Sequence, residues 1–107
     1  MPYYTVKELK AKTMTKGVEL RPIPGENMTM AFYKMEADAI IPEHSHPHEQ
    51  MGTVLKGTID LRIGDETRRV HEGDAYHVPP NVVHEGKSQT PAEVLEVFYP
   101  PREDFLK

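Results

Sequence analysis

Prolines and glycines interrupt this chain so often that long helices are excluded over most of its length. The sequence contains ten prolines and seven glycines among 107 residues. From Gly17 onward, these residues, together with Asn and Asp, separate short runs in which apolar and polar side chains alternate. In the run 58–63, Ile59, Leu61 and Ile63 would share one face of an extended strand. The pattern predicts about eight short strands in an antiparallel sandwich or closed barrel.

Two local signals add detail to this all-β expectation. Thr5 and Glu8 have the spacing of a capping box, which predicts a short N-terminal helix near residues 5–11. Gly64 and Asp65 stand between two alternating runs, and they predict a tight hairpin turn.

Composition limits both the size of the interior and the class of partner. A chain of 107 residues, 37% of them hydrophobic, suits one domain with a modest core. The formal net charge is −4, so we expect no nucleic-acid partner. The absence of cysteine excludes disulfides and thiolate metal ligands. The sequence shows no signal-peptide core and no apolar run that could span a membrane, which favours a soluble cytoplasmic domain.

The stretch 42–57, PEHSHPHEQMGTVLKG, carries the strongest chemical signal in the sequence. His44 and His46 are two residues apart, so their imidazoles point to the same side of an extended strand. Gln50 keeps the same parity. Three neutral nitrogen or oxygen donors on one wall are what a divalent transition metal requires. A third imidazole has to come from the histidines later in the chain: His71, His77 and His84.

The neighbours of these three histidines differ. His71 follows two arginines and is expected to face solvent. His77 precedes a Val-Pro pair and could line a pocket or pack in the core. His84 lies beyond a Pro-Pro-Asn turn, which would bring the chain back over the first stretch.

Two linked motifs resemble those of the cupin superfamily. They read His44-x-His46-x3-Gln50-x6-Gly57 and Gly73-x5-Pro79-x-Asn81-x2-His84. The resemblance covers about residues 20–100 of a single domain, 1–107, and implies an antiparallel β-barrel of the double-stranded β-helix or jelly-roll type. It also implies one divalent transition metal ion inside the barrel. Zn, Ni, Mn and Fe all accept this type of ligand. The implied ligands are His44, His46, Gln50 and His84.

Gln50 and Asn81 depart from the Glu and Gly that most cupins carry at these positions. Asn tolerates the turn conformations that Gly supplies, so the second departure is mild. With Gln50 as a ligand, every donor is neutral, and a divalent ion would keep its full charge. Such a site should attract an anionic oxygen and act as a strong Lewis acid. Glu49 is the alternative ligand, because a shift of one residue in register would supply a carboxylate instead.

A second informative patch lies near the C-terminus. Glu96 and Phe98 share strand parity, so both would face the barrel interior if one does. Arg102 follows two prolines and could hold a substrate carboxylate at the mouth of the barrel. The alternative is that Glu96 faces water and that Arg102 pairs with Glu103 or Asp104 on the surface.

This ending, together with HSHPHEQ, is similar to the small cupins of pectin and alginate breakdown, which open 4,5-unsaturated uronic acids to the linear ketone. The resemblance implies that Glu96 is the base, that Arg102 holds the substrate and that Phe98 packs on the sugar face. The acid in that family is typically Asp, one methylene shorter than Glu. Tyr76 and His77 are further candidates for contact with the substrate and for assisting proton transfer.

These features favour a metal-dependent isomerase that acts on a small anionic sugar or carboxylate. Two alternatives stay open: another metal-dependent cupin enzyme, such as a dioxygenase or lyase, and a non-catalytic cupin that binds a small acid. No membrane partner is expected. A small antiparallel barrel has exposed edge strands, which favours a homodimer.

Overall fold

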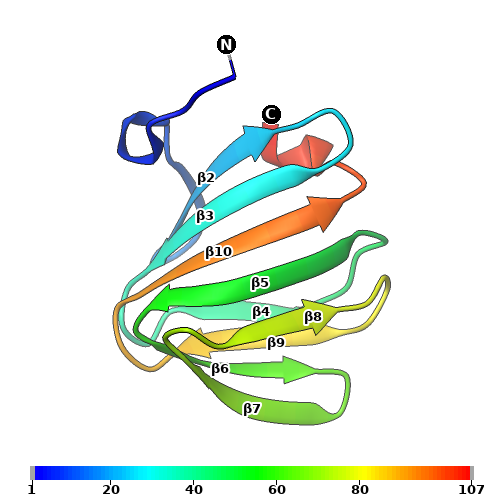
Figure 1. The fold of residues 1–107 in the computed structure, drawn as a ribbon. Coiled ribbons are helices and arrows are strands. Elements are labelled where there is room, and N and C mark those ends of the chain that lie inside the picture. Colours follow the sequence, from blue (N-terminus) through cyan, green and yellow to red (C-terminus); the bar gives the residue numbers. More distant parts are fainter. Residues whose placement is uncertain (1, 107) are drawn as a thin grey trace.

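Within residues 2–106, which this computed structural model describes, ten strands form two antiparallel sheets that face each other (Figure 1). Sheet A contains, in spatial order, β1 (Lys12–Thr15), β2 (Val18–Pro24), β3 (Thr29–Met35), β10 (Ala92–Tyr99), β5 (Glu49–Lys56) and β8 (Ala75–Val78). Sheet B contains β4 (Ile40–His44), β9 (His84–Ser88), β6 (Thr58–Ile63) and β7 (Glu66–His71). The all-β antiparallel barrel predicted from the sequence is confirmed, with ten strands in place of about eight.

Alternation along β10 shows how these segments form the wall of the barrel. The even-numbered residues from Ala92 to Phe98 are buried, whereas the residues between them are exposed or half-buried. β10 lies between β3 and β5 and pairs with both along nearly its whole length. The same alternation in β6 buries Ile59 and Leu61, the face that the sequence predicted.

The apolar interior lies between the two sheets. Burial of a Val, Leu or Phe side chain stabilises a fold by about 1.5–3 kcal/mol, so these residues hold the sheets together. The buried apolar cluster contains Val18, Leu20, Ala31, Tyr33, Met35, Ala39, Val54, Ile59, Leu61, Val70, Ala92, Val94, Phe98 and Phe105.

The N-terminal helix is shorter than the sequence predicted. It is a single 3-10 turn, η1 (Val6–Glu8), and Leu9 already has an extended backbone. Thr5 occupies the N-cap position, but its side chain makes no capping hydrogen bond. Without that bond the first turn lacks the stabilisation that a capping box supplies, and the helix does not continue.

The predicted turn at Gly64-Asp65 is confirmed, and it joins β6 to β7. After β10, a second 3-10 helix, η2 (Glu103–Leu106), places Phe105 in the core. Among residues 2–106, no helix has the length and apolar character needed to cross a membrane.

Two glycines with left-handed backbones provide a test of the fold. Gly57 (φ 83°) follows β5, and a Cβ added there would lie 2.3 Å from the carbonyl oxygen of Pro91. Gly73 (φ 89°) has nothing within 4 Å of an added Cβ. We expect Gly73→Ala to destabilise the protein by about 1–2 kcal/mol, the cost of the left-handed backbone alone. Gly57→Ala should cost more, because the backbone at Pro91 must also move.

Urea unfolding of the two variants measures this difference. Equal losses of unfolding free energy would contradict the close approach described at Gly57.

Candidate metal centre and active site

Three histidines from distant parts of the sequence converge between the sheets. His44 ends β4 and lies directly opposite His84, the first residue of β9. His46 follows in the connection to β5. One ligand nitrogen of each imidazole lies within 4.8 Å of those of the other two, close enough for all three to contact one metal ion.

A backbone carbonyl fixes the orientation of each imidazole. The ring Nδ1 atoms bond to carbonyl oxygens two residues away: His44 to Pro42 at 2.7 Å, His46 to His48 at 3.1 Å and His84 to Val82 at 2.9 Å. A neutral imidazole has one N–H, so these bonds leave each Nε2 as an acceptor. The Nε2 of His84 is buried, and it has no hydrogen-bond partner within residues 2–106. A metal ion would satisfy this atom. The arrangement is also the usual one at metal sites, where a ligating histidine donates its other ring N–H to a carbonyl oxygen.

The Pro-Pro-Asn turn brings the second motif against the first. Asn81 has a φ of 66°, in the left-handed region that Asn tolerates better than most residues with a side chain. Its backbone N–H donates to the carbonyl oxygen of His46 at 2.8 Å. This bond ties the turn to the histidine-rich stretch just before His84 begins β9.

Gln50 faces the three imidazoles. Its side chain is 5% exposed, and its Oε1 lies 3.0 Å from the Nε2 of His46. When Nδ1 of His46 holds the proton, both of these atoms are acceptors, and a cation would satisfy both. The two atoms lie close enough together to contact the same ion. Three imidazoles and an amide therefore fit a divalent transition metal.

Two of the imidazoles, those of His46 and His84, are held in the neutral form that binds metal. Burial, together with the positive charge of Arg102 and the neighbouring His84, lowers the pKa of His46 to about 4. Burial also lowers the pKa of His84. Protons therefore compete weakly with a metal at these two nitrogens near neutral pH.

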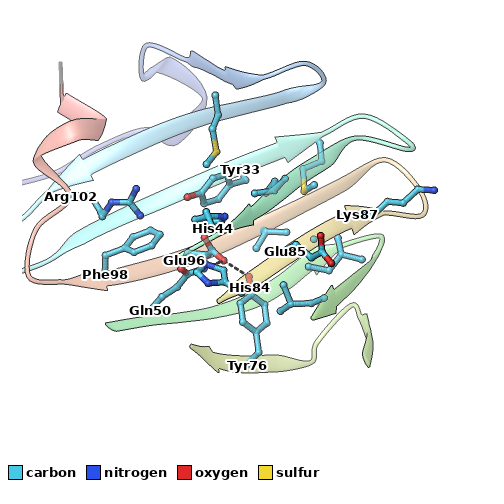
Figure 2. A pocket seen from close by; sticks show the side chains of 17 residues that line it. Tyr33, His44, Gln50, Tyr76, His84, Glu85, Lys87, Glu96, Phe98 and Arg102 are labelled. Carbon is cyan, nitrogen blue, oxygen red and sulfur yellow. Dashed lines mark hydrogen bonds between the residues drawn. The ribbon is translucent and has the colours of Figure 1, made fainter. Parts of the chain in front are cut away.

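The carboxylate of Glu96 lies beside this set of donors (Figure 2). Glu96 is 8% exposed, and it accepts hydrogen bonds from Nε2 of Gln50 at 2.5 Å and from the hydroxyl of Tyr76. Burial raises the pKa of Glu96, although these two bonds, Tyr33 and the charge of Arg102 act in the opposite direction. A carboxylate with a raised pKa is a better proton acceptor, so Glu96 is suited to act as a base.

Two tyrosines border the same pocket as Glu96. Burial and the negative charge of Glu96 raise the pKa of both Tyr33 and Tyr76 well above the usual range. Both hydroxyls therefore keep their protons near neutral pH and are available as donors.

Arg102 is buried instead of reaching over an open mouth. Its guanidinium lies 4.7 Å from the ring centre of Phe98 and 4.0 Å from that of Phe105. Nε and Nη2 donate to the two carboxylate oxygens of Asp104 at 3.0 and 2.9 Å. Arg102 pairs with Asp104, as the sequence allowed, yet it also lines the pocket with Phe98 (Figure 2). The Nη1 group takes no part in that pair.

Three residues that the sequence analysis considered, His77, Glu49 and His71, lie outside this group. His77 is exposed on the outer face of β8, where its Nε2 lies 2.7 Å from the exposed carboxylate of Glu49. Adjacent residues of a strand point to opposite faces, so Tyr76 lines the pocket and His77 does not. Glu49 faces outward for the same reason. His71 is exposed at the end of β7, and His48 packs edge-on against His46 at a ring distance of 5.4 Å.

Tyr33 and Gly52 belong to the site, although the sequence did not single them out. Tyr33 borders the pocket, and Gly52 lies beneath the ring of Tyr76. An isolated glycine inside a strand often marks a close approach of another group, and that signal was present at Gly52. No comparable signal distinguishes Tyr33 from a tyrosine of the core.

Comparison with known proteins gives one family and several relatives. A sequence profile of the Cupin domain family matches residues 31–98. The pectin degradation protein KdgF of Dickeya dadantii is 29% identical over 107 residues, which cover 97% of each chain. H2HPP isomerase of Bacillus subtilis is 34% identical over 58 residues, which are 53% of this chain and 25% of that protein. The solved structure of KdgF from Halomonas sp. is similar over 98% of both chains, with a TM-score of 0.91 and 23% identity, which shows a shared fold.

The metal-free protein should lose stability as the pH falls from about 6.5 to about 4. In this range the imidazole of His46 is protonated in the unfolded chain and neutral in the folded one, because its folded pKa is about 4. The unfolded state then binds more protons, so acid favours unfolding. Urea unfolding across this pH range measures how the unfolding free energy depends on pH. This dependence should be weaker in His46→Gln than in wild type, and the same as in wild type in the exposed control His71→Gln. The same slope in all three proteins would show that His46 titrates normally.

Removal of a central histidine should remove the metal. We expect His44→Ala or His84→Ala to lower the metal content of the purified protein at least about tenfold, since loss of a ligand leaves too few donors. His71→Ala is the control and should keep wild-type content, measured by elemental analysis. Loss of metal from the His71→Ala protein would show that the metal ligands have been assigned to the wrong histidines.

Proposed function

The chain belongs to the Cupin domain family, and we propose that it is a metal-dependent isomerase of sugar acids. Its substrate would be a 4,5-unsaturated uronate, whose ring it opens to the linear ketone. The observation that carries the proposal is the buried carboxylate of Glu96, which lies against Gln50 beside the three histidines. Support also comes from the relatives, which include a pectin degradation protein that matches over almost the whole chain.

The proposed ligands of the ion are His44, His46, Gln50 and His84, and the ion is Zn, Ni, Mn or Fe. When bound, a divalent ion would supply positive charge that attracts the substrate carboxylate and stabilises the negative oxygen that develops during ring opening. The neutral ligand set suits this role, because it leaves the full charge of the ion available to an anion.

Glu96 would move the proton. It accepts the proton of the hemiacetal hydroxyl; a carbonyl forms at that carbon, and its bond to the ring oxygen breaks. The electron pair passes to the ring oxygen, which becomes an enolate next to the substrate carboxylate. Return of the proton from Glu96 to the far carbon of the enolate gives the ketone and restores the carboxylate.

Arg102 and Phe98 would bind the substrate from the same side of the pocket. The pairing with Asp104 uses Nε and Nη2 of Arg102, so Nη1 is the atom assigned to the substrate. Asp104 and the stacked rings of Phe98 and Phe105 hold the guanidinium in one place. A guanidinium fixed in advance loses little conformational entropy when an anion binds. Phe98 would pack on the face of the sugar, and Tyr76 would contact the substrate beside Glu96.

We also propose that the whole chain is one cupin domain and that it forms a homodimer. The outer face of sheet A carries exposed apolar side chains on neighbouring strands, Met30 on β3, Met51 on β5 and Tyr99 on β10. An apolar surface of this kind is often covered by a second copy. The cytoplasmic location expected from the sequence stays a prediction.

Anaerobic incubation of the metal-loaded protein with an unsaturated uronate tests the activity. The absorbance of the enol ether should disappear much faster than in the spontaneous reaction. Glu96→Gln should lower kcat at least about 100-fold, because the amide cannot accept the proton. Glu93→Gln, an exposed change on the same strand, should retain wild-type kcat.

Failure of the wild-type protein to accelerate ring opening would rule out the isomerase. Consumption of oxygen with any acid substrate would instead favour a dioxygenase.

A further inference from the structure

Glu96 lies in a row of four residues that are side by side on neighbouring strands of sheet A. Ala31 on β3, Glu96 on β10, Gly52 on β5 and Tyr76 on β8 are successive partners in the strand register. The two direct neighbours of Glu96 therefore have no side chain beyond Cβ. Longer side chains from other positions can therefore reach the carboxylate from both sides.

The absence of a side chain at Gly52 lets Tyr76 reach Glu96. A Cβ at position 52 would lie 2.5 Å from both the Cζ and the hydroxyl oxygen of Tyr76. The tip of the tyrosine ring therefore occupies the space beside Gly52, and its hydroxyl donates to Glu96 (Figure 2). Any side chain at position 52 would have to displace this ring.

Gln50 enters the space from the next row, where it lies opposite Phe98 on β10 and Val78 on β8. Both ends of its amide are used. Oε1 faces the Nε2 of His46 at 3.0 Å, and Nε2 donates to Glu96 at 2.5 Å. A carboxylate at position 50 could still supply the oxygen toward His46, but it has no N–H for Glu96.

We propose that Gln50, Gly52 and Tyr76 are positioning residues that hold the carboxylate of Glu96 for reaction, and that the acid at position 96 requires an amide at position 50. Two ionised carboxylates in this contact would have no hydrogen-bond donor between them. Their like charges would also repel each other in a buried environment. The role in reaction rests on the proposed function, whereas the pairing of residues 50 and 96 does not.

An exchange of the two groups tests the pairing without any activity. The thermal midpoint of unfolding is measured in chelator for wild type, Gln50→Glu, Glu96→Gln and the double exchange Gln50→Glu/Glu96→Gln. Gln50→Glu should lower the midpoint by at least about 4–8 °C, the effect of roughly 1 kcal/mol in a domain of this size. The double exchange restores one amide and one carboxylate, so it should recover most of that loss. A double variant whose loss equals the sum of the single losses would overturn the pairing.

Kinetics of metal-loaded protein test the positioning role. Gly52→Ala should lower kcat about 10- to 100-fold with KM and metal content nearly unchanged, because a carboxylate misplaced by about 1 Å reacts slowly. Tyr76→Phe should lower kcat to a similar extent with metal content nearly unchanged. Gly52→Ala should add little further loss in the Tyr76→Phe background. Tyr3→Phe, a change at an exposed tyrosine outside the sheets, is the control that should keep wild-type kcat.

The outcomes separate the two proposals. A wild-type protein that is inactive on the uronate ends the proposed function, while the exchange in chelator still decides whether residues 50 and 96 depend on each other. An active protein in which Gly52→Ala and Tyr76→Phe keep wild-type kcat overturns the positioning role.

Discussion

The burial of one carboxylate governs how the interior of this barrel is arranged. A charged group in an apolar environment costs several kcal/mol unless donors or opposite charges replace the water that it loses. Gln50 and Tyr76 supply donors to Glu96, and Arg102 adds a positive charge nearby. Each of these groups comes from a different segment, and Gly52 leaves the space in which two of them meet. The strands that carry the core thus also determine the geometry of the candidate site.

Much of this arrangement was predictable, because it depends on local patterns. The alternation of apolar and polar side chains has a period of two residues. This period is visible in the sequence, and it predicted the strands and their inward faces. The same parity placed Gln50 inward and Glu49 outward. It also places Tyr76 and His77 on opposite faces, so the prediction that both line the pocket could not hold for the two together. The expected helix near residues 5–11 was too long, because the cap of Thr5 does not form.

The remaining features depend on the register between strands that are distant in sequence. Tyr33 borders the site because β3 pairs with β10, and Tyr76 crosses Gly52 because β8 pairs with β5. Side-chain packing selects such a register, and no short segment records it. The burial of Arg102 is a similar case. The sequence offered either a free guanidinium or a surface pair, whereas two aromatic rings from β10 and η2 create a third environment.

The proposed ligands belong to both halves of the barrel, His44 and His84 to sheet B and Gln50 to sheet A. The bond between Gln50 and Glu96 joins residues 46 apart, and the bond from Arg102 to Thr29 joins residues 73 apart. Contacts so distant in sequence carry an entropic cost of loop closure, so they form only when strands far apart in the chain have paired. An ion held there would connect the two sheets, and its release would weaken the whole barrel at once. Loading with metal would then raise the resistance of the whole barrel to unfolding, in addition to supplying the charge that the reaction needs.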